Sequence, residues 1–326
     1  MELYTTVEPL RGFPSLSHCH RLMLMGSCFA SHIGAKLAEA KFRCDIHPYG
    51  VLYNPASIAT ALSELLEGKR YTPADLYEQR GLWHSPMHHS DFSAPTPDEA
   101  LERINRRLQQ AREALPATDF LLLTWGTAYV YREREGGRIV GNCHQRPERD
   151  FVRERLEVDD IVETYNRLLA ALWERNPQLQ VILTVSPIRH RRDGLHANQL
   201  SKSVLLLAAD RLCQAYEGRV HYFPAYELLM DELRDYRFYA DDLVHPSATA
   251  IGWVWERFVQ SCFSAETRQV AEECLEIAKA LAHKPFRPEG EAYKRFLAQI
   301  VLKIERLNEK YPYLVFEKEI EICRTR

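Results

Sequence analysis

Long apolar runs and an excess of charge of one sign are both missing from this sequence. Each apolar run is far shorter than the roughly 18 residues that a membrane-spanning helix needs. The net charge is −3, from 42 Lys and Arg against 45 Asp and Glu, with the signs mixed along the chain. This balance predicts neither a nucleic-acid nor a membrane partner. Residues 1–10 lack a basic segment and an apolar core, so we predict no signal peptide and a cytoplasmic protein.

The common cofactor motifs are missing as well. No Gly-x-Gly-x-x-Gly follows the first predicted strand, and the segment GAKL lacks the Gly-Lys-Ser/Thr of a phosphate-binding loop. The eight cysteines are spread out with no Cys-x-x-Cys, which disfavours a zinc ribbon and favours small buried residues. We therefore predict a protein without a cofactor.

One stretch has metal-like spacing. Residues 67–96 are rich in His, Pro and Ser, and His84 and His88 are four apart, which suits two ligands on a helix. Pro86 lies between them and disfavours a regular helix. We predict no metal and interpret the segment as a loop that lines or covers a site. A metal-dependent site on the histidines of 84–89 stays as an alternative.

Short apolar segments alternate with helical patterns along the first two thirds of the chain. The apolar segments predict buried strands at 21–25, 42–46, 119–125, 180–185 and 219–223. The predicted helices include 55–66, 97–114, 159–175 and 198–218, the last running from an Asn198 cap to Gly218. This alternation predicts an α/β fold with a doubly wound, mostly parallel five-stranded sheet, whose ligands bind beyond the carboxyl ends of the strands.

Three further segments complete the organisation. Residues 128–142 predict a hairpin that brings Asn142, Cys143 and His144 to the functional edge. The charged stretch 153–160 is interpreted as solvated surface. After residue 263, two helices broken at 284–290 predict a C-terminal αα-hairpin, which gives domains 1–263 and 264–326. The hairpin is a candidate contact of a homo-oligomer.

Cys28 stands where the first strand gives way to a helix. The free N–H groups at a helix N-terminus favour negative charge, so this position predicts a lowered thiol pKa and a place for an oxyanion. A small buried cysteine is the alternative interpretation.

His245 is the candidate base for such a nucleophile. Asp242 lies three residues earlier, a spacing that lets its carboxylate accept the imidazole Nδ1–H and leaves Nε2 for a proton. Asp241 is the alternative partner, but the spacing favours Asp242. The pair follows the last predicted strand and so belongs to the functional edge.

Several blocks, in order, resemble the GSCFA domain family, which is related to the SGNH/GDSL hydrolases. The resemblance covers roughly residues 15 to 262 and rests on GSCFA at 26–30, HPYGVLYNP at 47–55, TWGTAYVY at 124–131, SPIRHRRDG at 186–194 and DDLVHPS at 241–247. It implies a flavodoxin-like sheet of the SGNH hydrolase type and a hydrolase or acyltransferase that acts on acyl esters.

The resemblance also implies roles for single residues. In SGNH enzymes the first block reads Gly-Asp-Ser and its Ser is the nucleophile, so Cys28 takes the nucleophile's place. The implied catalytic triad is Cys28, His245 and Asp242, and Gly50 is the implied oxyanion donor of the second block. A shift by one residue would make Ser27 the nucleophile, and this alternative stays open.

The third block departs from the family pattern. SGNH enzymes have Gly-x-Asn-Asp there, whereas this chain reads GTAY at 126–129, so the Asn that donates to the oxyanion is missing. Losing one such donor costs on the order of a hundredfold in rate. Asn54, Thr127 and Asn142 are candidate replacements, and we favour Asn142 because the hairpin can fold it over the site.

Other polar residues at this edge are candidates for substrate binding. Arg189 follows the strand at 180–185, where a guanidinium suits a carboxylate or a phosphate. His190, His144, Thr127 and Tyr49 are further candidates, with structural hydrogen bonds as the alternative interpretation.

Two functions of different classes follow. The first is an ester hydrolase or acyltransferase without a cofactor, acting on a small-molecule or glycan acyl ester. The second is a binding module for a small molecule or glycan on a hydrolase scaffold that has lost catalysis, because fold does not fix function.

Overall fold

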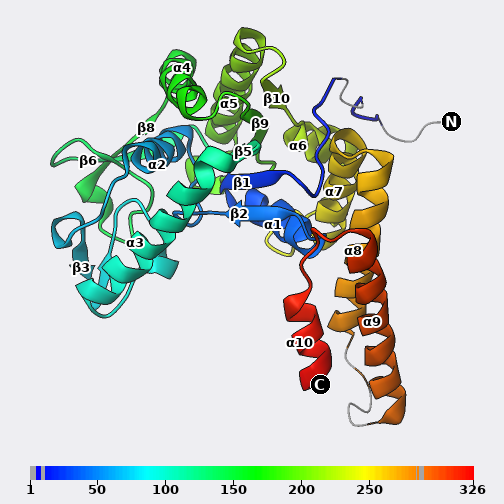
Figure 1. Cartoon of the computed structure of the whole chain (residues 1–326). Helices are drawn as coiled ribbons and strands as arrows, with labels where there is room; N and C mark the ends of the chain where they lie inside the picture. Colours follow the sequence, from blue (N-terminus) through cyan, green and yellow to red (C-terminus); the bar gives the residue numbers. More distant parts are fainter. Residues whose placement is uncertain (1–4, 9–11, 284, 286–289) are drawn as a thin grey trace.

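The computed structural model describes residues 5–8, 12–283, 285 and 290–326, and a five-stranded parallel sheet forms its centre (Figure 1). The strand order is β10-β9-β5-β1-β2, with bounds β1 (Arg21–Gly26), β2 (Arg43–Ile46), β5 (Phe120–Trp125), β9 (Gln180–Val185) and β10 (Val220–Tyr222). All four pairings are parallel. In chain order this is the doubly wound, flavodoxin-like arrangement, so the predicted α/β fold is confirmed.

Alternate residues of each strand face two separate cores, because successive side chains point to opposite faces of a sheet. Met23 and Leu121 pack toward α2 (Pro55–Glu67), α3 (Pro97–Ala114), α4 (Val158–Arg175) and α5 (Leu195–Ala215). Leu22 and Leu122 pack toward α1 (Cys28–Glu39), the short α6 (Ala225–Glu227) and α7 (Ala248–Cys262). Figure 1 shows α4 and α5 on one side of the sheet and α1 and α7 on the other.

Helix boundaries follow the predicted caps in one case and not in another. At α2, the Asn54 side chain accepts the Ser57 N–H at 2.8 Å, and Pro55 is the first helical residue, as predicted. The predicted Asn198 cap of α5 is wrong. Gly194 precedes that helix with φ +82° and accepts the Asn198 N–H at 2.9 Å, so Asn198 is buried inside the helix.

Two small sheets lie outside the central one. The predicted hairpin is confirmed as β6 (Tyr129–Glu133) and β7 (Ile139–Val140), and β8 (Phe151–Arg155) pairs with β6 on its other side. Arg153 is therefore not the solvated residue that its charge predicts, since it lies over the rings of Tyr129 and Tyr131. Glu157, Asp159 and Asp160 of the same charged stretch are exposed, as predicted. Within segment 67–96, β3 (Tyr77–Gln79) pairs with β4 (Leu82–His84).

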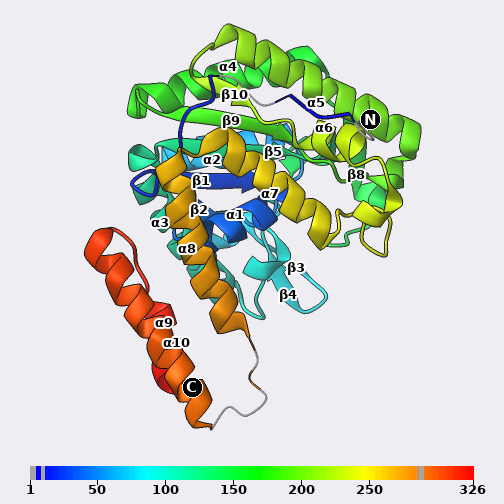
Figure 2. The same cartoon turned by 90° about the vertical axis from the view of Figure 1, so that its right-hand side faces the viewer.

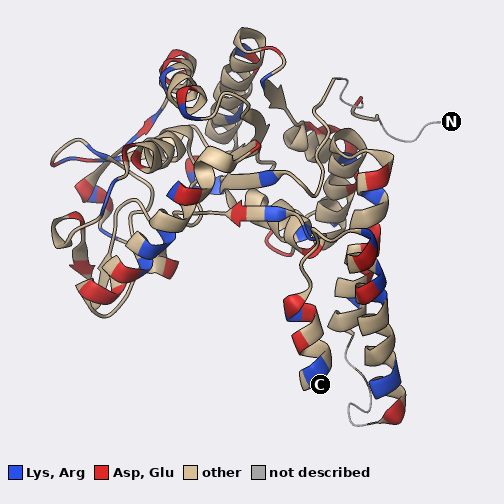
Figure 3. Ribbon diagram, in the orientation of Figure 1, with Lys and Arg blue, Asp and Glu red and all other residues tan. Residues whose placement is uncertain are grey.

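The C-terminal helices build a third core of their own. They are α8 (Ala265–Ala282), α9 (Glu291–Lys310) and α10 (Glu317–Thr325), so the predicted hairpin has a further helix. Figure 2 shows α9 and α10 lying away from the sheet, and Figure 3 shows both signs of charge along α8 and α9. Most of the predicted break at 284–290 lies outside the described residues. The boundary at 263/264 stays a prediction.

Two observations concern the chain as a whole. All eight cysteines are free thiols. Among the described residues, no helix combines the length and the apolar character that crossing a bilayer requires.

The third core yields a prediction about stability. Ile304 is fully buried on α9, so Ile304→Ala is expected to lower the free energy of unfolding by about 2–5 kcal/mol through lost burial and a cavity. Leu302 is 53% exposed on the same helix, and Leu302→Ala is expected to change the free energy of unfolding by less than about 0.5 kcal/mol. Urea denaturation measures both, and equal losses would contradict this packing.

Candidate active site

A cavity of about 660 Å³ lies at the carboxyl ends of β1, β5 and β9. Among its lining residues are eight of the eleven site residues predicted from the sequence: Ser27, Cys28, Thr127, Asn142, His144, Arg189, His190 and His245. Tyr49, Gly50 and Asp242 are not among the lining residues. The parallel sheet therefore gathers residues that are more than 200 positions apart in the chain at one edge.

The turn from β1 into α1 puts Ser27 and Cys28 on this cavity. Gly26 ends β1 with φ +140°, and a Cβ there would lie 2.2 Å from the Thr124 carbonyl oxygen. Only glycine fits so close an approach. Ser27 donates its N–H to the same oxygen at 3.0 Å, and α1 starts at Cys28.

Opposing effects act on the Cys28 thiol. Burial is the largest and raises its pKa, whereas hydrogen bonds from the Cys28 and Phe29 backbone N–H groups and the charge of Lys202 lower it. The net pKa is raised, so the predicted lowering is wrong. The helix N-terminus acts as expected, but it is outweighed by desolvation. Cys28 is therefore a neutral thiol at neutral pH.

Ser27 is the more enclosed of the two candidate nucleophiles. The residue is 1% exposed, and its hydroxyl has no hydrogen-bond partner in the described part of the chain. Ser27 Cβ and His190 Nε2 both lie 3.3 Å from the position of a Cβ on Gly126, so the two side chains are neighbours. His190 has a pKa lowered to about 4, mainly by burial, and is neutral at neutral pH.

His245 is held by Asp242 as the spacing predicts. The carboxylate lies 2.5 Å from His245 Nδ1 and also accepts the N–H groups of Val244 and His245, each at 2.9 Å. The backbone and side-chain hydrogen bonds from His245 lower the pKa of Asp242 to about 2. A carboxylate on Nδ1 fixes the neutral tautomer in which Nε2 is the proton acceptor. The side chains of His245 and Asp242 are 47% and 50% exposed, and of the two only His245 lines the cavity.

A fully buried lysine lies beneath the cavity. Lys202 Nζ donates to the carbonyl oxygens of Gly126, at 2.6 Å, and Ser186, at 2.5 Å. It thereby ties together the chain segments that leave β5 and β9. Burial, with a smaller contribution from the charge of Arg189, lowers the pKa of Lys202 to about 7.

Two of the predicted residues have other partners in the structure. The Gly50 N–H donates to the His47 carbonyl oxygen at 2.9 Å, so it is not free for an oxyanion. A Cβ on Gly50 would lie 2.2 Å from His89 Cβ, so glycine lets segment 67–96 pack on this turn. The Tyr49 side chain is fully buried and donates to Glu64 at 2.8 Å, which is a structural role.

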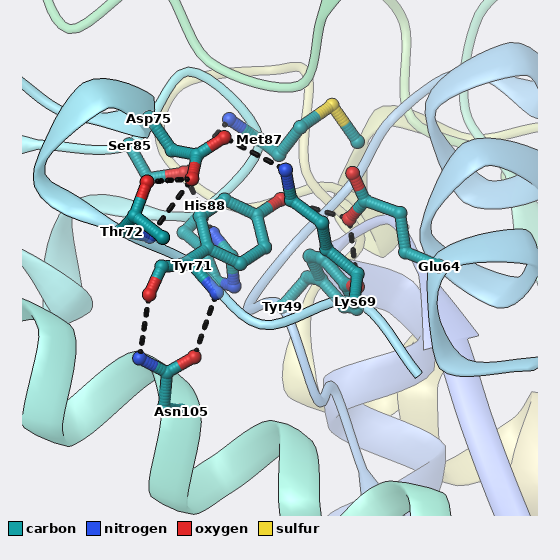
Figure 4. Close-up of polar contacts among 10 residues, drawn as sticks. All are labelled: Tyr49, Glu64, Lys69, Tyr71, Thr72, Asp75, Ser85, Met87, His88 and Asn105. Carbon is teal, nitrogen blue, oxygen red and sulfur yellow. Dashed lines mark hydrogen bonds and ion pairs between the residues drawn. The ribbon is translucent and has the colours of Figure 1, made fainter. Parts of the chain in front are cut away.

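A polar cluster fixes segment 67–96 to the sheet domain. In Figure 4 Glu64 accepts the hydroxyls of Tyr49 and Tyr71, each at 2.8 Å. Asn105 of α3 makes two hydrogen bonds with the Tyr71 backbone. His88 is fully buried, stacks on the Tyr49 ring at 4.5 Å, and has a pKa lowered to about 3 by burial. This part of the segment packs on the sheet domain, and its His89 lines the cavity.

His84 of this segment and His144, which follows β7, both make hydrogen bonds. His84 bonds with Ser93, and His144 with Ser90 and the Ser85 carbonyl oxygen. Within the described ranges, no group of three or more His, Cys, Asp or Glu side chains is placed to hold a metal ion.

Sequence reasoning missed Lys202 and Arg153. Lys202 sits on a helix face that also carries Asn198, Ser201 and Leu205, all buried. Asn198, Ser201 and Lys202 are polar residues at positions i, i+3 and i+4 of an otherwise apolar helix face, and this spacing could have indicated a buried polar site. Arg153 was hidden in a charged stretch, and its place in β8 depends on pairing with β6.

Comparisons with known proteins bear on this arrangement. A model of the GSCFA family matches residues 21–258, and a model of the GSCFA domain protein, C-terminal domain, matches residues 274–326. No curated protein matches. A carbohydrate esterase family 3 structure from Talaromyces cellulolyticus is 11% identical, with 78% of this chain and 99% of that chain covered and a TM-score of 0.36. The acetyl xylan esterase Est2A from Butyrivibrio proteoclasticus is 12% identical, with 74% and 62% covered and a TM-score of 0.34.

The buried lysine generates a prediction about pH. With a folded pKa of about 7, Lys202 has released its proton at alkaline pH, whereas an unfolded lysine binds it up to about pH 10.4. The unfolded state then binds more protons, so stability rises with pH between these values, by up to about 1.4 kcal/mol per pH unit. Urea denaturation at several pH values should give a steeper rise for the wild type than for Lys202→Met. Equal slopes would contradict the lowered pKa, and a ¹³C-lysine NMR titration of the wild type measures it directly.

Proposed function

The chain belongs to the GSCFA family, and from this premise and the geometry of the cavity we propose that it is an ester hydrolase with Cys28 as its nucleophile. The observation that carries the proposal is a single cavity lined by both Cys28, at the N-terminus of α1, and His245, whose Nδ1 is bound to Asp242. A nucleophile, a base and a group that orients the base are the three parts that acyl transfer needs.

The proposed reaction proceeds through a thioester. His245 Nε2 takes the thiol proton as Cys28 Sγ attacks the acyl carbonyl carbon. The tetrahedral intermediate collapses, the C–O bond to the alcohol breaks, and the imidazolium returns the proton to the departing alkoxide. Water, deprotonated by the same imidazole, then attacks the thioester and releases the acid and the thiol. An alcohol in place of water gives acyl transfer instead.

The raised pKa of Cys28 fits this order of events. A thiol that is neutral at rest is activated only when the base removes its proton. The backbone N–H groups of Cys28 and Phe29 face the sulfur and, as the first residues of a helix, have no intrahelical partner. They are the proposed first contribution to an oxyanion hole.

Asn54 is our candidate for the second contribution. It lines the cavity, and its Oδ1 accepts the Ser57 N–H, which leaves the amide Nδ2 as a donor. Its neighbours in the chain lie against the nucleophile's turn, because Leu52 donates to the Gly26 carbonyl oxygen at 2.9 Å. The predicted replacement, Asn142, also lines the cavity, and its Oδ1 accepts the His144 N–H. The proximity of the 52–54 segment to Gly26 makes us favour Asn54.

A binding module without catalysis is the second candidate function. The raised thiol pKa favours it as well, because a protonated thiol without an effective base is inert. Hydrolysis assays separate the two functions.

The nucleophile is tested by single substitutions assayed with 4-nitrophenyl acetate. Cys28→Ala is expected to lower kcat/KM by on the order of a thousandfold or more, and Ser27→Ala by less than about tenfold. Mass spectrometry of the wild type after a short reaction should find one acetyl group on Cys28. The reverse pattern of losses would assign the nucleophile to Ser27, and no hydrolysis by the wild type would favour the binding module.

The oxyanion hole is tested with a matched pair of variants. Asn54→Asp keeps the oxygen that accepts the Ser57 N–H but removes the amide donor, and it is expected to lower kcat by about a hundredfold or more. Asn142→Asp keeps the acceptor for the His144 N–H and is expected to change kcat by less than about tenfold. A larger loss in Asn142→Asp would restore the assignment predicted from the sequence.

A further inference from the structure

The wall of the cavity carries more positive than negative charge. Five arginines line it, against two carboxylates, in a protein whose net charge is −3: Arg146, Arg153, Arg189, Arg191 and Arg192, with Glu148 and Asp193. A cavity lined by an excess of one sign concentrates ligands of the opposite sign. The wall therefore favours an anionic ligand over a neutral one.

Three of these arginines already have carboxylate partners. Arg153 forms a two-pronged ion pair with Asp193, with both N–O distances at 2.6 Å. Arg146 binds Glu133 at 2.6 Å, and Arg192 pairs with Glu148. Their charges are largely compensated within the protein.

Arg189 differs from them. In the described part of the chain its guanidinium has no carboxylate partner, and its one hydrogen-bond contact is with Met230 Sδ at 3.9 Å. Its Nε is buried and has no hydrogen-bond partner there. Its charge also opposes that of Lys202, which is fully buried nearby. A guanidinium without a carboxylate partner in the described chain is costly in a partly dry site, and an anion would offset that cost.

Arg189 also lines the same cavity as the proposed base, His245. Met230 Sδ accepts from Arg189 and, at 3.5 Å, from the Tyr239 hydroxyl. Tyr239 forms an antiparallel bridge with Pro246, the residue after His245. These contacts connect the guanidinium to the loop that carries the imidazole, and Arg189, His245 and Cys28 line the same cavity.

We propose that Arg189 binds an anionic group, a carboxylate or a phosphate, on the alcohol part of the ester, so that the substrate is an acylated organic anion. The inference that the substrate is an ester rests on the proposed function. The inference that it carries an anionic group rests only on Arg189 and the cavity. A guanidinium presents parallel N–H donors that match either group.

The test compares an anionic with a neutral ester of the same shape. 3-Acetoxybenzoate carries the carboxylate, its methyl ester does not, and 3-acetoxyphenyl phosphate replaces the carboxylate by a phosphate. The wild type is expected to prefer an anionic ester over the methyl ester by on the order of tenfold or more in kcat/KM at low salt. Whichever anion gives the larger preference identifies the group.

Matched variants assign the preference to one residue. Arg189→Gln is expected to abolish it while the methyl ester is still hydrolysed, and Arg189→Lys to restore part of it. Arg192→Gln removes an equal charge that is already paired with Glu148, so it is expected to keep the preference. Equal kcat/KM for charged and neutral esters in the wild type, or loss of the preference in Arg192→Gln alone, would overturn the inference and leave the hydrolase standing.

Binding without turnover separates the two proposals. Calorimetry with inorganic phosphate and with 3-hydroxybenzoate uses the full chain carrying Cys28→Ala, alone and combined with Arg189→Gln. One outcome is that Cys28→Ala binds either anion, the double variant binds neither, and the wild type hydrolyses no ester. That outcome supports the anion site and overturns the proposed function. Absence of both anion binding and the anionic preference overturns the inference.

Discussion

The close approach of two strands at Gly26 is the constraint on which the site depends. A side chain there would meet the Thr124 carbonyl oxygen at 2.2 Å, so β1 and β5 can stay paired to the turn only with glycine at that position. The chain then passes directly into α1, and Cys28 becomes the first residue of a helix. The Cys28 side chain thus stands on rigid elements, beside the first N–H groups of α1, which have no partner within the helix.

A fully buried lysine, Lys202, holds the same edge of the sheet together. Lys202 bonds to two carbonyl oxygens that flank the cavity, and burial depresses its pKa to about 7. Its charge reaches both Cys28 and Arg189. Burial and charge oppose each other at the thiol, and burial prevails. The resting thiol is therefore neutral, and in the proposed mechanism the His245 imidazole removes its proton.

Much of the fold and part of the site could be predicted from the sequence. The five apolar segments became the five parallel strands, and the Asn54–Pro55 pair marked the start of α2. Asp242 and His245 are bonded as their spacing indicates, because three residues suffice to close that loop. Such features depend on neighbours in the chain. The Asn198 cap failed although it too is local, because a glycine one turn earlier let the helix start there.

The sequence by itself determined the order of strands and helices, the family blocks and the histidine–aspartate pair, because local patterns and short spacings carry that information. Only the tertiary structure decided the state of the groups at the sheet edge. Burial raised the pKa of Cys28 against the effect of its helix, the His47 carbonyl took the Gly50 N–H, and Tyr49 went into the core. It also placed Lys202 under the cavity and left Arg189 without a carboxylate partner in the described chain. These outcomes depend on desolvation and on contacts between distant segments, which no spacing along the chain encodes.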